Sequence, residues 1–482
     1  MLRLFGHRNA ADLTRRLYRH RNPVRPRGSR PLVCEPLEDR NLLSFIVQSP
    51  IPVTGINPAV PVAADLFNHQ QPDLAVTNNY LGSPNGSVTI YKNTTGTTAG
   101  DITFTETQEI PVGQEPIGIT TGQFTSSGLN DLVVADNGDG DGTIAVLLND
   151  PNNPGTFLAP VYYQVGAKPF SVVVGQFTPS GNQDILVGTS TNTVSLLLGN
   201  GDGTFQAPLQ ISTGGDGGLD VSATPFTAGG NYNIVVANNL TNTVSVLLGN
   251  GDGTFQSPVV YPVGVQPYTV AVGDVNNDGF ADIVVANQDP SGGTVSVLLN
   301  DGTNNFPTRV DYPAGTTPSD VVLGNFRGDN RIDLAVSNSP IFGGGVSVLL
   351  GNGDGTFGPF SSYSTGAYAA GLTVADFNSD GFPDIVVANA FSNTISVLRN
   401  DGMTVPPPSP AAPASPEQSV PLVSAAPVTP SIAPILPSVN AVSPGAKTVS
   451  VGFRHSPPAQ GAEPAWLEDF ATQASGWTEW AG

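Results

Sequence analysis

The sequence is nearly without cysteine and has no long, continuous apolar run. Cys34 is the one cysteine among 482 residues, so no disulfide can form within the chain. The fold must therefore be held by packing, backbone hydrogen bonds and any bound metal. The long uncharged stretch after Glu417 is interrupted repeatedly by proline, and no apolar run is long enough for a transmembrane segment.

Charge of either sign is scarce, and positive charge is the scarcer. Charged residues make up 12% of the chain, and 18 Lys and Arg stand against 39 Asp and Glu. Ten of the 18 basic residues, all arginines, precede Phe45, so the body of the protein is strongly acidic. Because nucleic-acid binding needs clustered Lys and Arg to meet the phosphates, this composition excludes a nucleic acid as a partner of the body.

Histidine is too rare to suggest a catalytic site. His69 and His455 are the only histidines after the arginine-rich leader, and neither lies beside a candidate nucleophile. The Gly-x-Ser-x-Gly turn that presents a serine nucleophile in many hydrolases does not occur. The sequence therefore identifies no catalytic residue and no site for an organic cofactor.

Glycine and proline are abundant, at 56 and 44 residues, and favour short strands joined by tight turns over a helical bundle. A unit of apolar strands and Asn/Asp/Gly-rich turns, clearest in residues 268–315, recurs along most of the chain. Each unit has a nine-residue loop between its first two strands, and these loops start at Asp65, Gln123, Gln176, Pro225, Asp274, Asn325 and Asp376. Seven units spaced by 49 to 58 residues predict an all-β fold, a seven-bladed β-propeller of four-stranded blades.

The two ends of the repeat region complement each other. The seventh unit stops at residues 400–402, after its third strand, and has no fourth strand of its own. At the other end, residues 45–55 resemble the fourth strand at 255–264. We predict that this N-terminal strand pairs into the last blade, because the pairing closes the ring and removes two open sheet edges.

Two of the nine-residue loops place oxygen atoms at alternate positions around a glycine turn. The predicted ligands are Asp274, Asn276, Asp278, the Phe280 carbonyl and Asp282 in the fifth unit, and Asp376, Asn378, Asp380, the Phe382 carbonyl and Asp384 in the seventh. Calcium takes six to eight oxygen ligands in a flexible cage, so we predict one Ca²⁺ in each loop. The alternative is a bare turn, for which Asp and Asn are also suited.

The other five loops depart from this pattern. In the sixth unit, Arg327 stands at the third ligand position, where its guanidinium could pair with Asp329 and Asp333 in place of a cation. In the first unit, Phe67 and His69 stand where oxygen ligands are expected. The loops of the second to fourth units offer neutral oxygens or none before their last residue. We expect these five loops to form the turn without a tightly bound ion.

The phrases GDVNNDGFADIVVAN at 273–287 and LLGNGDGTF at 247–255 resemble FG-GAP/VCBS repeats, the blades of integrin-α-like propellers. The resemblance extends over roughly residues 45–402 and implies calcium in the loop between the first two strands, with ligands on the opposite face. It implies a secreted or cell-surface, calcium-stabilised binding or adhesion module for an extracellular protein or glycan. The alternatives are an extracellular polysaccharide-active enzyme (lyase or hydrolase) on the same scaffold, and a passive structural surface protein.

Four segments are predicted along the chain. They are a disordered basic leader at 1–44, a monomeric propeller at 45–402, a Pro/Ala/Ser-rich linker at 403–450, and a tail at 451–482 that holds all three tryptophans. Within the leader, residues 37–43 resemble the LEPR-x-LL-type N-terminal motif of planctomycete surface proteins, and this resemblance implies export. The tail is either a short docking helix or a frayed amphipathic end.

Overall fold

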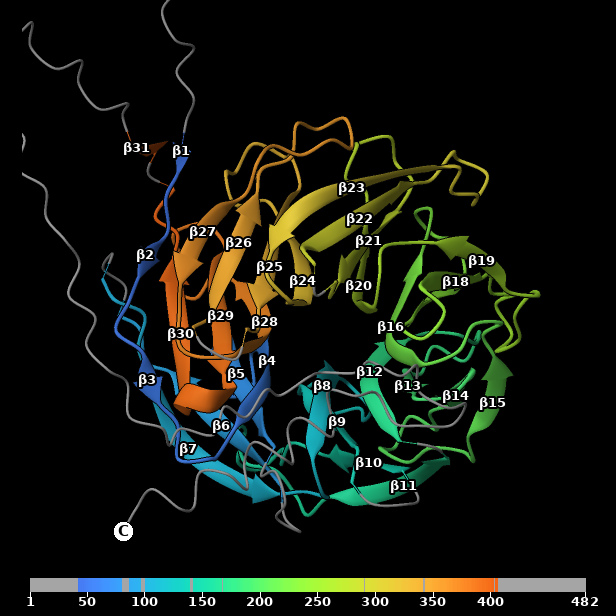
Figure 1. Ribbon diagram of the computed structural model, residues 1–482. Helices are drawn as coiled ribbons and strands as arrows, with labels where there is room; N and C mark the ends of the chain where they lie inside the picture. Colours follow the sequence, from blue (N-terminus) through green and yellow to red (C-terminus); the bar gives the residue numbers. More distant parts are fainter. Residues whose placement is uncertain are drawn as a thin grey trace, which may run out of the picture.

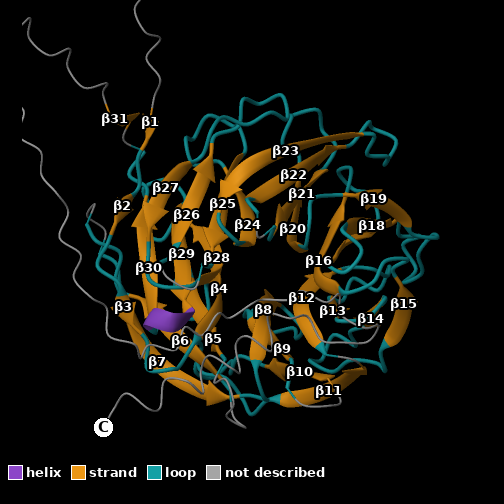
Figure 2. Cartoon of the chain, in the orientation of Figure 1, coloured by secondary structure: helices purple, strands orange, loops and turns teal. Residues whose placement is uncertain are grey.

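The computed structural model describes residues 42–405, except for 80–85, 97–99, 139–141, 167, 290, 341–342 and 403 (Figure 1). The predicted leader, linker and tail lie outside these residues, apart from the short strands β1 (Leu42–Leu43) and β31 (Thr404–Val405), which pair with each other. The described chain is built of strands, with one turn of 3₁₀-helix at Ala390–Ser392 (Figure 2). No helix in this part of the chain is both long and apolar enough to cross a membrane.

Seven antiparallel sheets stand around one axis, as predicted, and form a seven-bladed β-propeller (Figure 1). The first strand of each blade lies nearest the axis, and these are β4 (Pro58–Ala64), β8 (Pro116–Gly122), β12 (Pro169–Gly175), β16 (Gly218–Pro225), β20 (Pro267–Gly273), β24 (Pro318–Gly324) and β28 (Ala369–Ala375). The second strands are β5 (Asp73–Asn78), β9 (Asp131–Asp136), β13 (Asp184–Thr189), β17 (Tyr232–Asn238), β21 (Asp282–Asn287), β25 (Asp333–Asn338) and β29 (Asp384–Asn389).

The third and fourth strands complete each blade toward its outer edge. The third strands are β6 (Ser87–Asn93), β10 (Gly142–Leu147), β14 (Thr193–Leu197), β18 (Thr243–Leu247), β22 (Gly293–Leu299), β26 (Gly345–Leu349) and β30 (Thr394–Arg399). The fourth strands of blades 1 to 6 are β7 (Phe104–Pro111), β11 (Val161–Gly166), β15 (Leu209–Ser212), β19 (Val259–Pro262), β23 (Thr308–Gly315) and β27 (Ser361–Ser364). Blades are numbered here in chain order, so blade 1 is β4–β7.

The last blade takes its outer strand from the other end of the chain. Strands β2 (Ile46–Val47) and β3 (Ile51–Pro52) both pair antiparallel with β30, with Ile46 opposite Arg399 and Ile51 opposite Ile395. The predicted closure of the ring is therefore confirmed. The last blade is thus completed by β2 and β3, so the edge of β30 is no longer open for pairing with another chain.

The apolar core lies between neighbouring blades. Every residue is buried in the second strands β5, β9, β13, β21, β25 and β29, because both faces of a blade pack against its neighbours. Between blades 4 and 5, for example, Phe226 packs with Val235, Val285 and Phe306. Phe226 is only 2% exposed, and burial of such a side chain contributes about 2–3 kcal/mol.

Candidate functional site

The nine-residue loops all join the first strand of a blade to the second and end in a residue that we call the closing residue. It is Asp73, Asp131, Asp184, Asn233, Asp282, Asp333 or Asp384 in blades 1 to 7. In blade 3, Oδ2 of Asp184 accepts the N–H of Phe177 at 3.0 Å, and Oδ1 accepts the N–H of Gly199 at 2.8 Å. The closing residue thus ties the loop to the hairpin that follows the third strand.

This structural role was missed in the sequence, where the closing position was assigned to metal binding in two loops. The aspartates of loops that lack the calcium pattern are just as buried, and Asp131 and Asp184 expose no surface. The signal was available, because an aspartate recurs at this position even where the preceding residues offer only neutral oxygens. A buried carboxylate that accepts two or more backbone N–H groups is itself a strong stabilising element.

The blade 5 loop has the wrapped form that the calcium pattern predicts. The two carboxylate oxygens of Asp274 accept the N–H groups of Asp278 and Gly279 at 3.1 and 2.8 Å. The Asn276 amide donates to Asp278 Oδ2 at 2.9 Å, and the N–H of Phe280 donates to Asp278 Oδ1 at 2.9 Å. Gly279 has a φ of +89°, the left-handed conformation that favours glycine at the turn.

The blade 7 loop repeats this geometry. Asp376 accepts the N–H groups of Asp380 and Gly381 at 3.1 and 2.9 Å, and the Asn378 amide donates to Asp380 Oδ2 at 2.9 Å. The N–H of Phe382 donates to Asp380 Oδ1 at 2.9 Å. The same chain path therefore forms twice, from two sequences that share the pattern of oxygen side chains.

Negative charge gathers at both loops. Burial, together with the nearby carboxylates of Asp278 and Asp274, raises the pKa of Asp282 to about 6, although hydrogen bonds from the Asn300 and Val275 N–H groups oppose the shift. Burial and the same two loop positions raise the pKa of Asp384 to about 7. Carboxylate oxygens held close together fit a hard divalent cation such as Ca²⁺. In neither loop, however, do three carboxylates bring one oxygen each within 4.8 Å of one another.

The blade 6 loop carries a cation of its own. Nη2 of Arg327 lies 2.6 Å from Oδ1 of the buried Asp333, and Nε lies 3.6 Å from Oδ2 of Asp329. The same Nη2 donates to the carbonyl of Gly351 at 2.6 Å. The predicted pairing of this guanidinium with both aspartates is confirmed. A positive charge at this place in one blade supports the fit of a cation at the same place in blades 5 and 7.

On the axis of the ring lies a pocket of about 210 Å³, to which all seven first strands or the residues just before them contribute. The lining residues stand at the beginnings of these strands, for example Ile117, Phe170 and Leu219. Since the nine-residue loops follow the other ends of the same strands, the pocket lies toward the face opposite the metal-type loops. We call it the axial pocket.

Two carboxyl groups line the axial pocket. Asp220 on β16 accepts the N–H of Val270 on the next blade at 2.8 Å, and Asp320 on β24 accepts the N–H of Leu372 on the next blade at 3.0 Å. Burial raises the pKa of Asp220 to about 6 and that of Asp320 to about 7, and the charge of Asp220 adds to the second shift. At neutral pH the pocket therefore holds two carboxyl groups close to their protonation equilibria.

Hydroxyl groups and apolar surface complete the axial pocket. Burial raises the pKa of Tyr268, with Tyr368, Asp220 and Asp320 adding to the shift, and burial raises the pKa of Tyr368 to about 12, so both phenols stay neutral. The buried hydroxyl of Thr269 has no hydrogen-bond partner among the described residues. A pocket with apolar walls and a few convergent polar groups is the usual form of a small-ligand site.

The sequence analysis did not identify the residues of the axial pocket. One signal was present, because Asp220 and Asp320 stand two residues into the first strand, where the other blades have Val60, Gly118, Ser171, Thr269 and Gly371. An acidic residue at a repeat position that is uncharged in the other blades is not explained by the packing of the blade. Only the ring, however, brings these positions to one axis.

Comparison with known families identifies the repeats. A model of the FG-GAP-like repeat matches residues 226–285, 274–336 and 326–387. These matches cover blades 4 to 7 in part, and the seven blades share one strand order. Residues 226–387 therefore carry FG-GAP-like repeats, and the described chain forms a seven-bladed β-propeller, as the sequence resemblance predicted. A search of curated proteins finds no match.

Solved structures show the same fold at low sequence identity. The structure of BBS1N in complex with ARL6DN, soaked with lead, is 12% identical, with 74% of this chain and 98% of that chain covered and a TM-score of 0.52. A candidate 6-phosphogluconolactonase from Bacteroides uniformis ATCC 8492 is 13% identical, with 73% and 95% covered and a TM-score of 0.50. At these identities the likeness extends to the fold alone.

Proposed function

We propose that this protein is a secreted or cell-surface binding module that captures a carbohydrate through its axial pocket and is stabilised by calcium on the opposite face. The observation that carries the proposal is the convergence of Asp220, Asp320, Tyr268 and Tyr368 on one pocket at the axis. Four different strands or their ends supply these groups, so the rigid ring fixes their arrangement. Binding sites on rigid elements lose little conformational entropy when the ligand enters.

A neutral sugar fits the chemistry of the pocket best. Phe170 and Tyr268 offer aromatic surface for the apolar face of a sugar ring, and the carboxyl and hydroxyl groups can exchange hydrogen bonds with its hydroxyls. Anionic ligands are disfavoured, because Asp220 and Asp320 carry negative charge above pH 7 and no Lys or Arg lines the pocket. A phosphorylated substrate is therefore a poor candidate for this pocket.

Calcium is assigned to the loops of blades 5 and 7, with the ligands predicted from the sequence. Asp274, Asn276, Asp278, Asp282 and the Phe280 carbonyl would hold one ion, and Asp376, Asn378, Asp380, Asp384 and the Phe382 carbonyl the other. The bound ions would neutralise the carboxylates of each loop and stiffen the turn. Sites of this kind in extracellular modules bind Ca²⁺ in the range of about 0.1–1 mM, which agrees with an extracellular location.

An enzyme that acts on polysaccharide is the second candidate, and the two axial carboxyl groups favour it. Glycoside hydrolysis by paired carboxyl groups requires one to be protonated while the other is ionised. The pKa values of Asp320 and Asp220, about 7 and about 6, permit that combination near neutral pH. In this case Asp320 would be the acid and Asp220 the base or nucleophile.

A glycan array with the purified full chain, with and without EDTA, separates these functions. Saturable binding without turnover, lost in Tyr268→Ala, supports the binding module, whereas release of shorter sugars that Asp320→Asn abolishes supports the enzyme. If the array shows neither binding nor sugar release, a passive structural role remains. Calorimetric titration with Ca²⁺ tests the metal loops separately, and Asp278→Ala and Asp380→Ala should each remove one of two binding events.

A further inference from the structure

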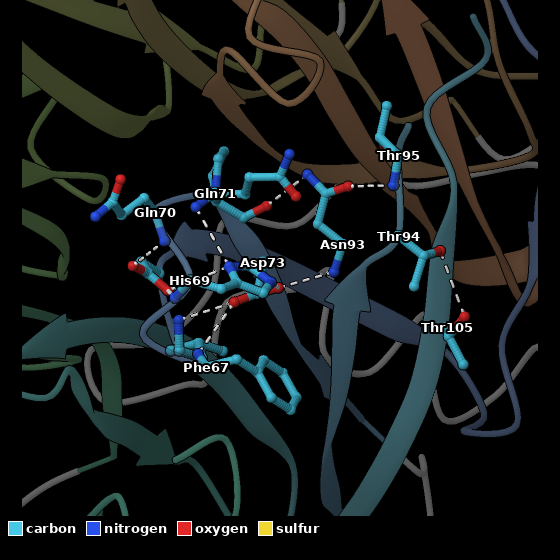
Figure 3. A network of polar contacts seen from close by, with 12 residues as sticks. Phe67, His69, Gln70, Gln71, Asp73, Asn93, Thr94, Thr95 and Thr105 are labelled. Atoms are coloured by element: carbon cyan, nitrogen blue, oxygen red, sulfur yellow. Dashed lines mark hydrogen bonds and ion pairs between the residues drawn. The ribbon is translucent and has the colours of Figure 1, made fainter. Parts of the chain in front are cut away.

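The blade 1 loop brings together a set of side chains unlike that of any other blade. Asp65, His69 and Asp73, which we call the blade 1 triad, each place one potential ligand atom within 4.8 Å of the other two. Figure 3 shows His69 and Asp73. They are the one such group of His, Cys, Asp and Glu in the described part of the chain. In the sequence, His69 counted only as a departure from the calcium pattern.

The distance between His69 and Asp73 suits neighbouring ligands of one ion. Nε2 of His69 lies 3.1 Å from Oδ1 of Asp73 (Figure 3). The opposite ring nitrogen, Nδ1, lies 3.5 Å from Oδ1 of Asp65 and is not the nitrogen that would bind the same ion. Two ligands that each bind a metal at about 2.0–2.1 Å stand roughly 3 Å apart in octahedral or tetrahedral geometry. The Nε2–Oδ1 distance therefore matches a pair of neighbouring ligands.

The surrounding hydrogen bonds hold the triad in place and leave it able to bind. Asp65 accepts the N–H groups of His69 and Gln70 at 2.9 and 2.7 Å, one on each oxygen. Oδ1 of Asp73 accepts the Asn93 N–H at 2.8 Å (Figure 3). A carboxylate oxygen with one such bond keeps a free lone pair. Nε2 of His69 is buried and, among the described residues, forms no hydrogen bond, even though Oδ1 of Asp73 lies 3.1 Å away.

Solvent can complete the coordination. The side chains of Asp65 and His69 are 29% and 23% exposed, while Asp73 is fully buried at the base of the loop. An ion among these three groups would therefore be bound by Asp73 on its buried side and accessible to water on the side of Asp65 and His69. Three protein ligands plus water is a common arrangement for divalent metals bound by histidine and carboxylate.

We propose that the blade 1 triad binds a divalent first-row transition metal, with Zn²⁺ as the reference ion, in place of calcium. Imidazole nitrogen suits zinc, cobalt and nickel, whereas calcium takes oxygen ligands almost exclusively. The propeller thus uses the loop between the first two strands of a blade in three ways. Blades 5 and 7 present oxygen ligands, blade 6 supplies the guanidinium of Arg327, and blade 1 supplies a nitrogen ligand.

The test is a titration of the full chain, stripped with EDTA and then dialysed, with Co²⁺ as a spectroscopic probe and Zn²⁺ as competitor. We expect one Co²⁺ to bind per chain and to give a visible absorption. Added Zn²⁺ should abolish this absorption, whereas excess Ca²⁺ should leave it unchanged. His69→Ala and Asp65→Asn should each weaken Zn²⁺ binding at least tenfold. The matched controls are His455→Ala, which removes a histidine outside the propeller blades, and Asp278→Ala, which alters a calcium-type loop.

Folding of the variants is followed by melting without metal, where each should melt within a few degrees of the parent. Added Zn²⁺ should then raise the melting temperature of the parent and of His455→Ala but not of His69→Ala. Equal Zn²⁺ affinity in the parent and His69→Ala would overturn the proposal. The absence of Co²⁺ absorption in the parent would overturn it as well.

Discussion

Nη2 of Arg327 lies 2.6 Å from Oδ1 of Asp333, at the loop position where blades 5 and 7 carry an asparagine of the calcium pattern. The guanidinium is 13% exposed and the carboxylate is fully buried, so this ion pair is largely removed from water. An internal cation thus neutralises a closing aspartate that would otherwise be charged and enclosed.

Arg327→Ala should destabilise the propeller by about 3 kcal/mol, because it leaves the buried Asp333 without its partner. Urea denaturation at pH 7 measures the change. Arg331→Ala is the control, since Arg331 is 43% exposed in its pair with Asp329 and its loss should cost less than about 1 kcal/mol. Equal effects of the two substitutions would contradict the assignment of Arg327 as the internal cation.

Phe45→Ala tests the closure of the ring. Phe45 is 5% exposed and lies edge-to-face against Phe326 and Tyr363, with ring centroids 5.4 Å away in both cases. Removing the ring should cost about 3–5 kcal/mol in unfolding free energy. Ile46→Ala, at a neighbouring site that is 39% exposed, should cost about 0.5 kcal/mol. A small effect of Phe45→Ala would mean that the N-terminal strand contributes little to the last blade.

Asp184→Ala tests whether the closing residue stabilises the blade independently of metal binding. Blade 3 lacks the calcium pattern, so the loss should be the same with Ca²⁺ and with EDTA. We expect about 2–3 kcal/mol, because the N–H groups of Phe177 and Gly199 lose their acceptor. Asp202→Ala, in the exposed hairpin of the same blade, should leave the denaturation midpoint unchanged. A calcium-dependent loss in Asp184→Ala would argue for a metal in blade 3.

The axial carboxyl groups predict a dependence of stability on pH. Asp320 has a pKa of about 7 in the folded protein against an ordinary value of 3.8, so the folded state holds a proton that the unfolded chain releases. Its contribution to stability is therefore present below about pH 4 and is lost as the pH rises through 7.

Asp320→Asn should remove the contribution of Asp320 to this dependence and stabilise the protein at pH 8 by about 1–2 kcal/mol. Melting temperatures of parent and variant between pH 5 and 8 measure it, and the gain should shrink as the pH falls. Asp252→Asn is the control, because hydrogen bonds from Thr254 lower the pKa of Asp252 and its removal should not flatten the slope. A gain that is equal at pH 5 and pH 8 would contradict the shifted pKa of Asp320.

The sequence by itself determined the features that depend on local spacing. Nine-residue loops at intervals of 49 to 58 residues predicted seven blades, and the missing fourth strand of the last unit predicted the pairing of residues 46–52 with β30. The pairing of Arg327 with Asp333 also followed from spacing. The two residues stand six positions apart in one nine-residue loop, so the loop leaves their side chains few other arrangements. Strand alternation and turn chemistry are short-range properties, so they can be inferred from neighbouring residues.

Only the tertiary structure decided which distant residues share a site. Asp220 and Asp320 stand on blades 4 and 6, and they line one pocket only because seven first strands surround a common axis. The blade 1 triad is local in sequence, yet its ligand character depends on how the loop turns His69 toward both aspartates. Such convergence is set by the number of blades and the path of each loop in space, which spacing along the chain does not specify.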